Sequence, residues 1–446
     1  MKIENKLERL RNGDIFEDLI QAWKRLGRLV YNDAATDPES LERATGLLYM
    51  THYLTAGATL AMELNDPDYP YFDRWADRSY SWGIDSPDGL YSFACIRGDS
   101  TYRIFGKRGT AHQFDIEVHS PHFANAPNYL RTGNLGFVDI DTEPDGSVEI
   151  VLSPEPPPED KKCNWIQLAP DAESVCVRQF FYDWENEQKA ELSIEKIDAK
   201  YPPPPEKPEV IVDKAELLIK WLDEAGTFWD EVIRTFMKEP NTVTFLNPKE
   251  SDWGGHGGLS YGMGSIEIGQ NEAALLEVKP PDCHFWGFQL GSIYWESMDW
   301  WRRQSSLNGF QAKCDSDGVF RCVISSQDPG VHNWLDTAGY SQLTIMGRWL
   351  HARDFPQPQI KVIPFEEIDK YLPENTQRIS LDERSEIIRR RNLSVQKILG
   401  LCFRLGVGLG HQAKVHQGGH HEKFSIRILL HTNVAFFCLW RGRGRN

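Results

Sequence analysis

Two stretches of this sequence resemble each other at a nearly constant spacing, and this repeat restricts the possible folds more than any other feature. The segment DGSVEIVLS at residues 145–153 corresponds to DGVFRCVIS at residues 317–325, which lies 172 positions later. Further pairs follow in the same order: His112 with His284, Phe114 with Trp286, Ile116 with Phe288, Asn164-Trp165-Ile166 with Asn333-Trp334-Leu335, and Arg178 with Arg348. Such an ordered series predicts two related structural units that arose by internal duplication.

Each copy has the pattern of antiparallel β-structure. Short segments of alternating polar and apolar residues are separated by turn sequences, among them Asp145-Gly146 and Asp317-Gly318. Asp-Gly accepts the positive φ of a tight turn, so we expect both pairs at equivalent hairpin tips. Many short strands at this spacing are typical of β-sandwiches and jelly rolls. We therefore predict a mainly β fold with two related antiparallel β-sandwich or jelly-roll units, a helical N-terminal segment and a central helix.

Changes in residue pattern divide the chain into six predicted regions. Apolar residues recur at helical spacing near the start: Leu19, Trp23, Leu26 and Val30. Asp37 before Pro38 indicates the start of a further helix, and Asp213 would cap the central helix after a run of prolines. The regions are a helical N-terminal region (1–79), sandwich unit 1 (80–199), a proline-rich linker and helix (200–240), sandwich unit 2 (241–365), a C-terminal helix (366–398) and a basic tail (399–446).

The tail differs in composition from the rest of the chain. Residues 399–446 hold seven Lys or Arg and one acid, a net charge of +6, whereas the preceding residues carry −22. Either the tail is a functional basic segment, or it is a non-native or disordered extension.

Charge and composition exclude several classes of partner. The net charge of −16 would repel a phosphate backbone, so we expect no nucleic-acid partner. No apolar run is long enough to span a membrane, and no nucleotide cofactor motif is present. The eight cysteines form no Cys-x-x-Cys pair, which favours free thiols in a cytoplasmic protein; only Cys314 and Cys322 flank one turn closely enough to consider a disulfide.

Several strings resemble a bacterial family classed as domain of unknown function 1214. They are RGDSTYRIFGKRG (97–109), NWIQLAPDAESVCVRQFFYDW (164–184) and DPGVHNWLDTAGY (328–340) followed by RWL (348–350). The resemblance covers most of residues 80–350 and implies jelly-roll-like β-structure with a second, related β domain. It implies no activity, so no catalytic residue is carried over from the family.

One predicted strand carries a row of ionisable side chains. Side chains alternate across a strand, so Asp115, Glu117 and His119 would share the face opposite Phe114 and Ile116. Two carboxylates and an imidazole can bind a divalent metal or supply acid–base catalysis, and we name these three residues as candidate catalytic and metal-binding residues. The alternative is an ordinary solvent-exposed sheet face.

Aromatic and polar residues in the second copy are candidate ligand-binding residues. Trp and Arg stack well on sugars and aromatic ligands, although the same residues also pack within proteins or at interfaces. A glycine-rich segment before Gly258-Leu259-Ser260-Tyr261-Gly262 adds a histidine; the strand-like sequence that follows argues against a serine-hydrolase nucleophile turn. The candidates are His256, Trp295, Trp301, Arg302, His332, Trp334 and Asp336.

Two functions remain open. The first is an enzyme of hydrolase or lyase type that acts on a small or sugar-like molecule in a sandwich cleft. The second is a non-catalytic ligand-binding or assembly protein that uses its aromatic surface, with a homo-oligomer as one form of assembly. A cleft that gathers ionisable side chains beside Trp rings would favour the first.

Overall fold

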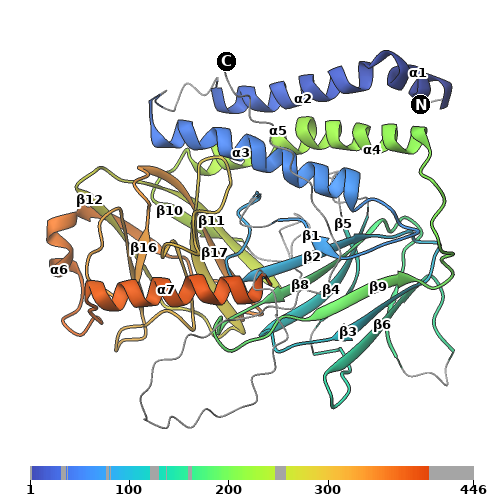
Figure 1. The fold of residues 1–446 in the computed structure, drawn as a ribbon. Coiled ribbons are helices and arrows are strands. Elements are labelled where there is room, and N and C mark those ends of the chain that lie inside the picture. The colour runs from blue at the N-terminus through green and yellow to red at the C-terminus, as the bar shows by residue number, and fades with distance from the viewer. Residues whose placement is uncertain are drawn as a thin grey trace, which may run out of the picture. The chain divides into compact units, whose positions relative to one another are not determined.

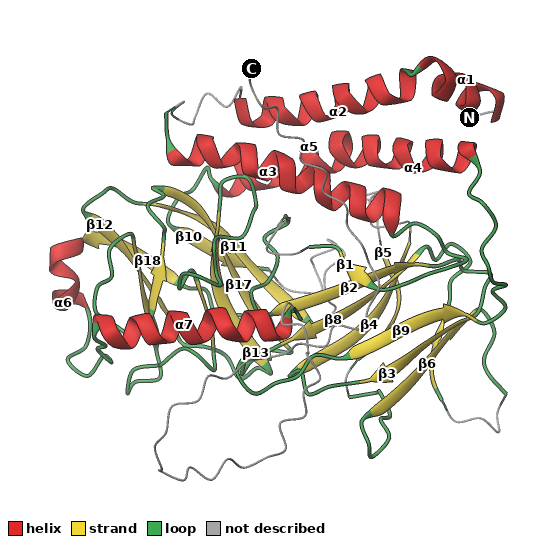
Figure 2. Ribbon diagram, in the orientation of Figure 1, coloured by secondary structure: helices red, strands yellow, loops and turns green. Residues whose placement is uncertain are grey.

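The computed structural model of the protein describes residues 3–31, 37, 39–76, 80, 82–120, 130–136, 138–158, 163–246 and 258–400. Within these residues the chain is mostly β-structure, with four sheets in two similar units and a group of helices (Figures 1 and 2). Both the mainly β class and the two related units predicted from the repeat are confirmed.

The first unit contains a five-stranded and a four-stranded sheet. The larger has the order β1 (Asp73–Arg74), β2 (Gly89–Cys95), β8 (Ser174–Phe180), β4 (Gln113–Ser120) and β5 (Leu130–Leu135). The smaller has the order β7 (Asn164–Gln167), β6 (Ser147–Ser153), β3 (Tyr102–Lys107) and β9 (Glu191–Lys196). Neighbouring strands are antiparallel except β6 and β7, which are parallel.

The second unit repeats this topology strand for strand. Its larger sheet has the order β10 (Thr242–Phe245), β11 (Leu259–Glu267), β17 (Gln342–Leu350), β13 (Phe285–Gly291) and β14 (Ser306–Asn308). Its smaller sheet has the order β16 (Trp334–Asp336), β15 (Phe320–Ser325), β12 (Glu272–Val278) and β18 (Gln359–Pro364). The only parallel neighbours in this unit's described strands are β15 and β16, the counterparts of β6 and β7.

The strand registers show which residues are equivalent. In unit 1, Arg178 on β8 lies opposite Tyr91 on β2. In unit 2, Arg348 on β17 lies opposite Tyr261 on β11 in the same way. Equivalent positions therefore differ by about 170 residues, as the sequence repeat predicted.

The two Asp-Gly turns are equivalent, and each closes a short hairpin tip in which the Glu143 N–H donates to the Ser147 carbonyl oxygen and the Asp315 N–H to that of Val319. In each turn the Gly N–H donates to the carbonyl oxygen three residues earlier, from Gly146 to Glu143 and from Gly318 to Asp315. Each turn follows a strand of the larger sheet and precedes a strand of the smaller sheet, and those two strands are not paired. The predicted equivalence of the two turns is therefore confirmed, although the named strands on either side of each turn belong to different sheets.

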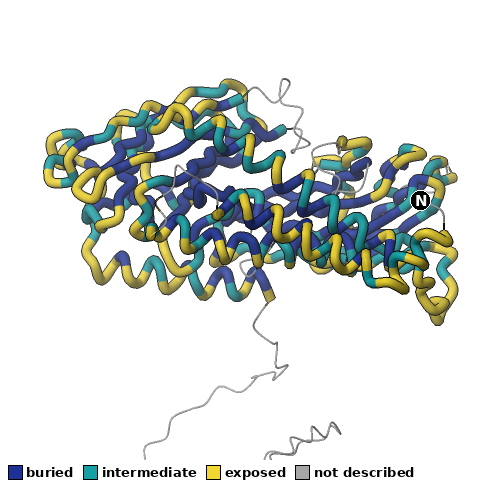
Figure 3. The backbone as a smooth tube through the Cα atoms, turned by 90° about the horizontal axis from the view of Figure 1, so that it is seen from above, coloured by how far each residue is buried: buried dark blue, intermediate teal, exposed yellow. Residues whose placement is uncertain are grey.

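Each unit is a sandwich because apolar residues of its two sheets pack against each other. In unit 1 the core joins Phe114 and Val177 of the larger sheet to Ile104 and Ile150 of the smaller one. The core of unit 2 is built from the corresponding strands. Figure 3 shows that buried residues follow the strands, while exposed residues concentrate on loops and outer helix faces.

Helices cover the outer faces of the two larger sheets. They are α1 (Ile3–Asn12), α2 (Asp14–Tyr31), α3 (Leu41–Ala58) with the π-helical turn Thr59–Glu63, and α4 (Pro208–Lys220) continued by a π-helical turn (Trp221–Ala225) into α5 (Gly226–Phe236). Leu26, Tyr53 and Trp221 from these helices share one apolar cluster with Phe180 of unit 1 and Phe285 of unit 2. The helical layer therefore packs against both units.

Three details of the predicted helices were wrong. The cap of α3 is Ser40, whose side chain accepts from the Arg43 N–H, and not Asp37. The central helix begins at Pro208, so Asp213 lies inside it; proline at the first turn loses no intrahelical hydrogen bond. Trp23 lies at the edge of the buried stripe of α2 and remains 37% exposed.

The described chain ends in α6 (Ile368–Tyr371), which follows the short 3-10 turn Phe365–Glu367, and in α7 (Leu381–Ile398). Ser380 and Glu383 form a capping box at the start of α7. The basic tail from residue 401 onward lies outside the described residues. Cys314 and Cys322 are both free thiols. Among the described helices, none has the length and apolar composition needed to cross a lipid bilayer.

Candidate functional site

The predicted row on β4 is buried. The exposed fractions of Asp115, Glu117 and His119 are 4%, 1% and 0%, so the solvent-exposed alternative is wrong. The alternation was predicted correctly: Phe114 and Ile116 point into the sandwich core, and the ionisable side chains point the other way. That outer face is buried because other parts of the protein cover it.

Glu117 lies between two arginines. Its carboxylate accepts a hydrogen bond from Arg178 Nε at 2.5 Å, and Arg131 Nη1 is 3.5 Å away. His119 Nε2 lies 3.6 Å from the same carboxylate. Burial lowers the pKa of His119 to about 4, although the negative charge of Glu117 acts in the opposite direction. His119 is therefore neutral at pH 7, and Glu117 is engaged mainly with arginine.

Asp115 is held by its neighbour on the same strand face. Gln113 Nε2 donates to both carboxylate oxygens, at 2.9 and 2.7 Å. The same amide nitrogen is 3.5 Å from Nε2 of His351, which comes from unit 2. Gln113 thus brings a carboxylate of one unit and an imidazole of the other to one place.

His351 has an unusual backbone conformation. Its φ is +52°, in the left-handed region that few non-glycine residues adopt. Its ring lies over Gly258, where an added Cβ would be only 2.4 Å from the ring atoms. His351 can take this position because Gly258 has no side chain.

A cleft of about 590 Å³ opens beside these residues. Unit 1 contributes most of its lining, and unit 2 contributes a glycine and two histidines. The lining residues are Gln113, Asp115, Glu117, Arg131, Asn134, Gly136, Val138, Asp139, Gly258, His284 and His351. Asp115 and Glu117 line this cleft, whereas His119 does not.

The remaining sequence-predicted ligand residues are distributed over other places. Trp295 is 4% exposed and lines a separate cavity described below. Trp301 packs beside the cluster of Trp184 and Trp300, and the exposed Arg302 guanidinium lies 4.5 Å from the centre of its ring. His256 lies outside the described residues.

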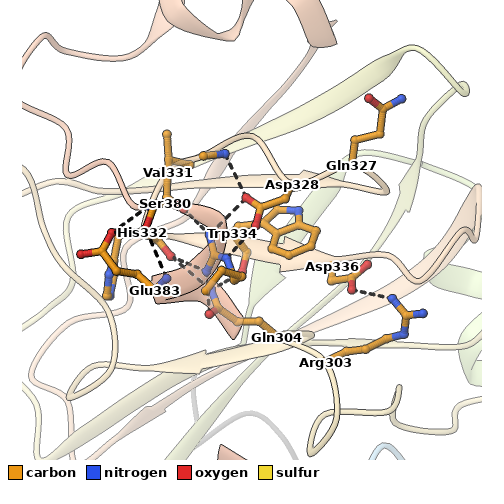
Figure 4. A network of polar contacts seen from close by, with 12 residues as sticks. Arg303, Gln304, Gln327, Asp328, Val331, His332, Trp334, Asp336, Ser380 and Glu383 are labelled. Carbon is orange, nitrogen blue, oxygen red and sulfur yellow. Dashed lines mark hydrogen bonds and ion pairs between the residues drawn. The ribbon is translucent and has the colours of Figure 1, made fainter. Parts of the chain in front are cut away.

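His332, Trp334 and Asp336 belong to a network that fixes α7 to unit 2 (Figure 4). Arg384 of α7 bonds Asp328 at 3.0 Å and the carbonyl oxygen of His332 at 3.2 Å. Its guanidinium also lies over the Trp334 ring, 5.0 Å from the centroid. Asp336 pairs with Arg303 at 2.8 Å. These contacts support the structural interpretation of this segment.

The Asn-Trp pairs repeat the same contacts in both units. Asn164 bonds the backbone of Asp141, and Trp165 Nε1 donates to Ser153 Oγ at 2.9 Å. Asn333 bonds the backbone of Lys313, and Trp334 Nε1 donates to Ser325 Oγ at 3.1 Å. Both copies have therefore kept the same structural contacts at this position. Ser260 is buried within β11 and is not at a strand-to-helix turn, as the sequence indicated.

Among the described residues, no group of three His, Cys, Asp or Glu side chains is arranged to hold a metal ion. The candidate ligand Glu117 is instead bound by arginine, and His119 does not line the cleft. Sequence analysis missed Gln113, Arg131 and His351 as partners of this row. Among the partners of this row, only Arg178 could have been singled out from the sequence, because it matches Arg348 in the repeat.

Comparison with known proteins finds a family of unknown function and solved structures of similar fold. Residues 94–182 match the family described as "Protein of unknown function (DUF1214)". This segment is therefore similar to the DUF1214 family. It includes β3 to β8, and therefore Asp115, Glu117, His119 and Arg178. The DPGVHNWLDTAGY string of unit 2 lies outside the matched segment, so the match is shorter than the predicted resemblance over residues 80–350.

The chain also resembles solved structures. A crystal structure of an uncharacterised protein from Burkholderia cenocepacia has a TM-score of 0.76 and 28% identity, covering 80% of this chain and 99% of that one. The VPA0106 protein from Vibrio parahaemolyticus has a TM-score of 0.42 and 14% identity, covering 71% and 98%. No curated protein shows significant sequence similarity to the chain.

Proposed function

We propose that the cleft along β4 binds a small polar molecule, and that Asp115 and His351 form the acid–base pair of a hydrolase or lyase. One observation carries this proposal. The buried Asp115 carboxylate of unit 1 and the His351 imidazole of unit 2 meet at the Gln113 amide beside an open cleft. A carboxylate and an imidazole are the usual groups for moving a proton near neutral pH.

Both reaction types need such a pair. In hydrolysis one group takes a proton from water while the other donates a proton to the leaving group. In elimination one group removes a proton from carbon and the other protonates the leaving group. Gln113 fixes the Asp115 carboxylate, and the left-handed backbone of His351 is the kind of strained conformation that is common at functional sites.

The lining suits a sugar-like ligand. Arg131, Asn134 and Asp139 offer donors and acceptors that can bond hydroxyl groups. The volume of about 590 Å³ lies within the range of roughly 300–1,000 Å³ for small-molecule sites. The proposal gives no role to a metal ion, because Glu117 is bound by Arg178 and Arg131 and His119 does not line the cleft.

A substrate screen with matched variants tests this proposal. Purified wild type, Asp115→Asn, His351→Gln and the control Asp171→Asn would be incubated with p-nitrophenyl glycosides, p-nitrophenyl esters and a small-molecule cell extract analysed by mass spectrometry. Asp171 is an exposed carboxylate of the same unit that does not line the cleft. Any compound consumed by wild type and by Asp171→Asn should be consumed about 100-fold more slowly by the two cleft variants.

Two results would count against catalysis in this cleft. Equal consumption by wild type and Asp115→Asn would place the chemistry elsewhere. If wild type consumes no compound in the screen, the result would favour the non-catalytic alternative.

A specific observation favours assembly as the second candidate function. Phe16, Ile20 and Trp23 recur at helical spacing on α2 and are 62%, 38% and 37% exposed. Leu47 and Leu48 on the adjacent α3 are also more than half exposed. A second copy of this chain could cover this surface, and sedimentation velocity of Phe16→Ser against wild type would reveal it. An unchanged sedimentation coefficient would argue against this surface as the dimer contact.

A further inference from the structure

A second cavity lies where the outer faces of the two larger sheets meet α5. Its volume is about 100 Å³, and aromatic rings form most of its wall. Tyr91 and Tyr261, which are equivalent residues of the two units, both line it. So do the equivalent arginines Arg178 and Arg348. The cavity therefore lies at the junction of the two units.

The two arginines differ in how their charge is balanced. Arg178 bonds the Glu117 carboxylate. At the position equivalent to Glu117, unit 2 has Gln289, and Arg348 bonds the Gln289 amide oxygen and the backbone oxygen of Ile84. Both acceptors are neutral, and among the described residues no carboxylate forms an ion pair with Arg348. Arg348 is only 6% exposed, so it is a buried cation that has lost the counter-charge of its counterpart.

Two hydrogen-bond donors of the cavity wall are also unused. The indole N–H groups of Trp229 and Trp295 are buried, and within the described part of the chain neither has an acceptor. The two rings lie edge to face, 4.7 Å apart. Buried polar groups are normally paired, so two idle donors beside a cation that forms no ion pair within the described residues indicate a missing acceptor.

The backbone around these groups is strained. Ile84 has a φ of +47° and Trp295 a φ of +59°, and both residues line the cavity. A left-handed conformation is especially unfavourable for a β-branched residue such as Ile84. The Ile84 N–H donates to the Trp295 carbonyl oxygen at 3.0 Å, and the Ile84 carbonyl oxygen accepts from Arg348 at 3.0 Å. The strained pair thus connects Arg348 with one of the idle indoles, and such strain concentrates at ligand sites.

We propose that this cavity binds a small organic carboxylate. Its oxygens accept hydrogen bonds from Arg348 and the indole N–H groups, and its short apolar chain contacts the aromatic wall. A volume of 100 Å³ corresponds to about three water molecules, at about 30 Å³ each, which limits the ligand to the size of acetate or propionate. The remaining carboxylate of the wall, Asp85, accepts from Ser297 and excludes ligands with a second negative charge.

This site is independent of the acid–base cleft, although the Arg178–Glu117 ion pair lies between the two. A negative result for carboxylate binding in this cavity therefore does not contradict the proposed acid–base function of the cleft.

Titration of the full chain with sodium propionate, followed by tryptophan fluorescence, tests the proposal. Wild type should show a saturable change, because Trp229 and Trp295 line the site. Propionamide, which has nearly the same shape and no charge, should bind at least tenfold more weakly, and sodium chloride at equal concentration should give no saturable change. This comparison needs no variant and so does not depend on folding.

Two variants and a control complete the experiment. Arg348→Gln should weaken propionate binding at least tenfold. Gln289→Glu should do the same while the fold persists, because it gives Arg348 the partner that Arg178 already has in unit 1. Arg353→Gln, which changes a side chain that is 84% exposed in the same unit, should bind like wild type. Absence of propionate binding to wild type, equal binding of propionamide, or unchanged binding by Gln289→Glu would each overturn the proposal.

Discussion

His112 and His284 stack face to face where the two units meet, with ring centroids 4.1 Å apart and ring planes inclined by 14°. Each Nε2–H donates to the backbone carbonyl oxygen of the other histidine, at 2.8 and 3.1 Å. A carbonyl oxygen only accepts, so both rings carry their hydrogen on Nε2. The two residues are equivalent in the repeat, and such reciprocal contacts are the mark of an approximate two-fold relationship between the units.

Acidification should destabilise the protein partly through His119. The pKa of this buried imidazole is lowered to about 4 in the folded state, against an ordinary value near 6.5. The unfolded chain therefore binds the proton first, so the contribution is complete above about pH 6.5 and is lost as the pH falls towards 4. At about 1.4 kcal/mol per pKa unit, the loss is roughly 3 kcal/mol. Urea unfolding of wild type and His119→Gln at pH 7 and pH 4.5 measures it; an equally steep pH dependence in the variant would contradict the assignment.

The Glu117–Arg178 pair should matter far more than a surface pair of the same type. Glu117→Gln leaves Arg178 buried without its carboxylate, and removing one partner of a buried pair costs about 3–5 kcal/mol. The matched control is Glu149→Gln, because Glu149 and Arg103 form a half-exposed strand pair in the same unit. That change should cost less than about 1 kcal/mol. Similar urea midpoints for the two variants would show that burial does not set the strength of the Glu117 pair.

Two helical glycines should respond differently to alanine. Glycine to alanine inside a helix normally stabilises by about 0.5–1 kcal/mol. A Cβ on Gly46 would lie 2.3 Å from Val30 Cγ1 and 3.1 Å from the Tyr294 ring, so Gly46→Ala should instead destabilise by about 1–3 kcal/mol. A Cβ on Gly27 meets the mobile end of Met50 at 2.8 Å, so Gly27→Ala should be neutral or stabilising. Thermal unfolding of both variants decides this, and a higher Tm for Gly46→Ala would show that the α2–α3 contact readily relaxes.

The two Asn-Trp pairs allow one substitution to be compared in two settings. Asn333 is 5% exposed, while its equivalent Asn164 is only partly buried, and each makes three hydrogen bonds with backbone groups. Removing a buried partner leaves backbone groups unsatisfied, so Asn333→Ala should cost about 2–3 kcal/mol and Asn164→Ala about 1 kcal/mol. Urea unfolding measures both losses. A larger loss for Asn164→Ala would contradict the dependence on burial.

Local rules predicted much of the fold. Alternation along residues 113–120 placed Asp115, Glu117 and His119 on one strand face, and the repeat predicted two similar units and the equivalence of Arg178 with Arg348. These properties depend on neighbours within a few residues or on direct comparison of two segments. The predicted start of α3 was wrong, since Asp and Ser are both good caps and the local sequence alone does not choose between Asp37 and Ser40.

Only the tertiary structure decided what surrounds the ionisable side chains of β4. Glu117 is bound by Arg178, 61 residues away, and Gln113 contacts His351, 238 residues away. The sequence determined on which side of β4 each side chain lies, because alternation is a local property of an extended backbone. It did not determine whether that side meets water, a second unit or a cleft, because burial arises from contacts between segments that no local pattern relates.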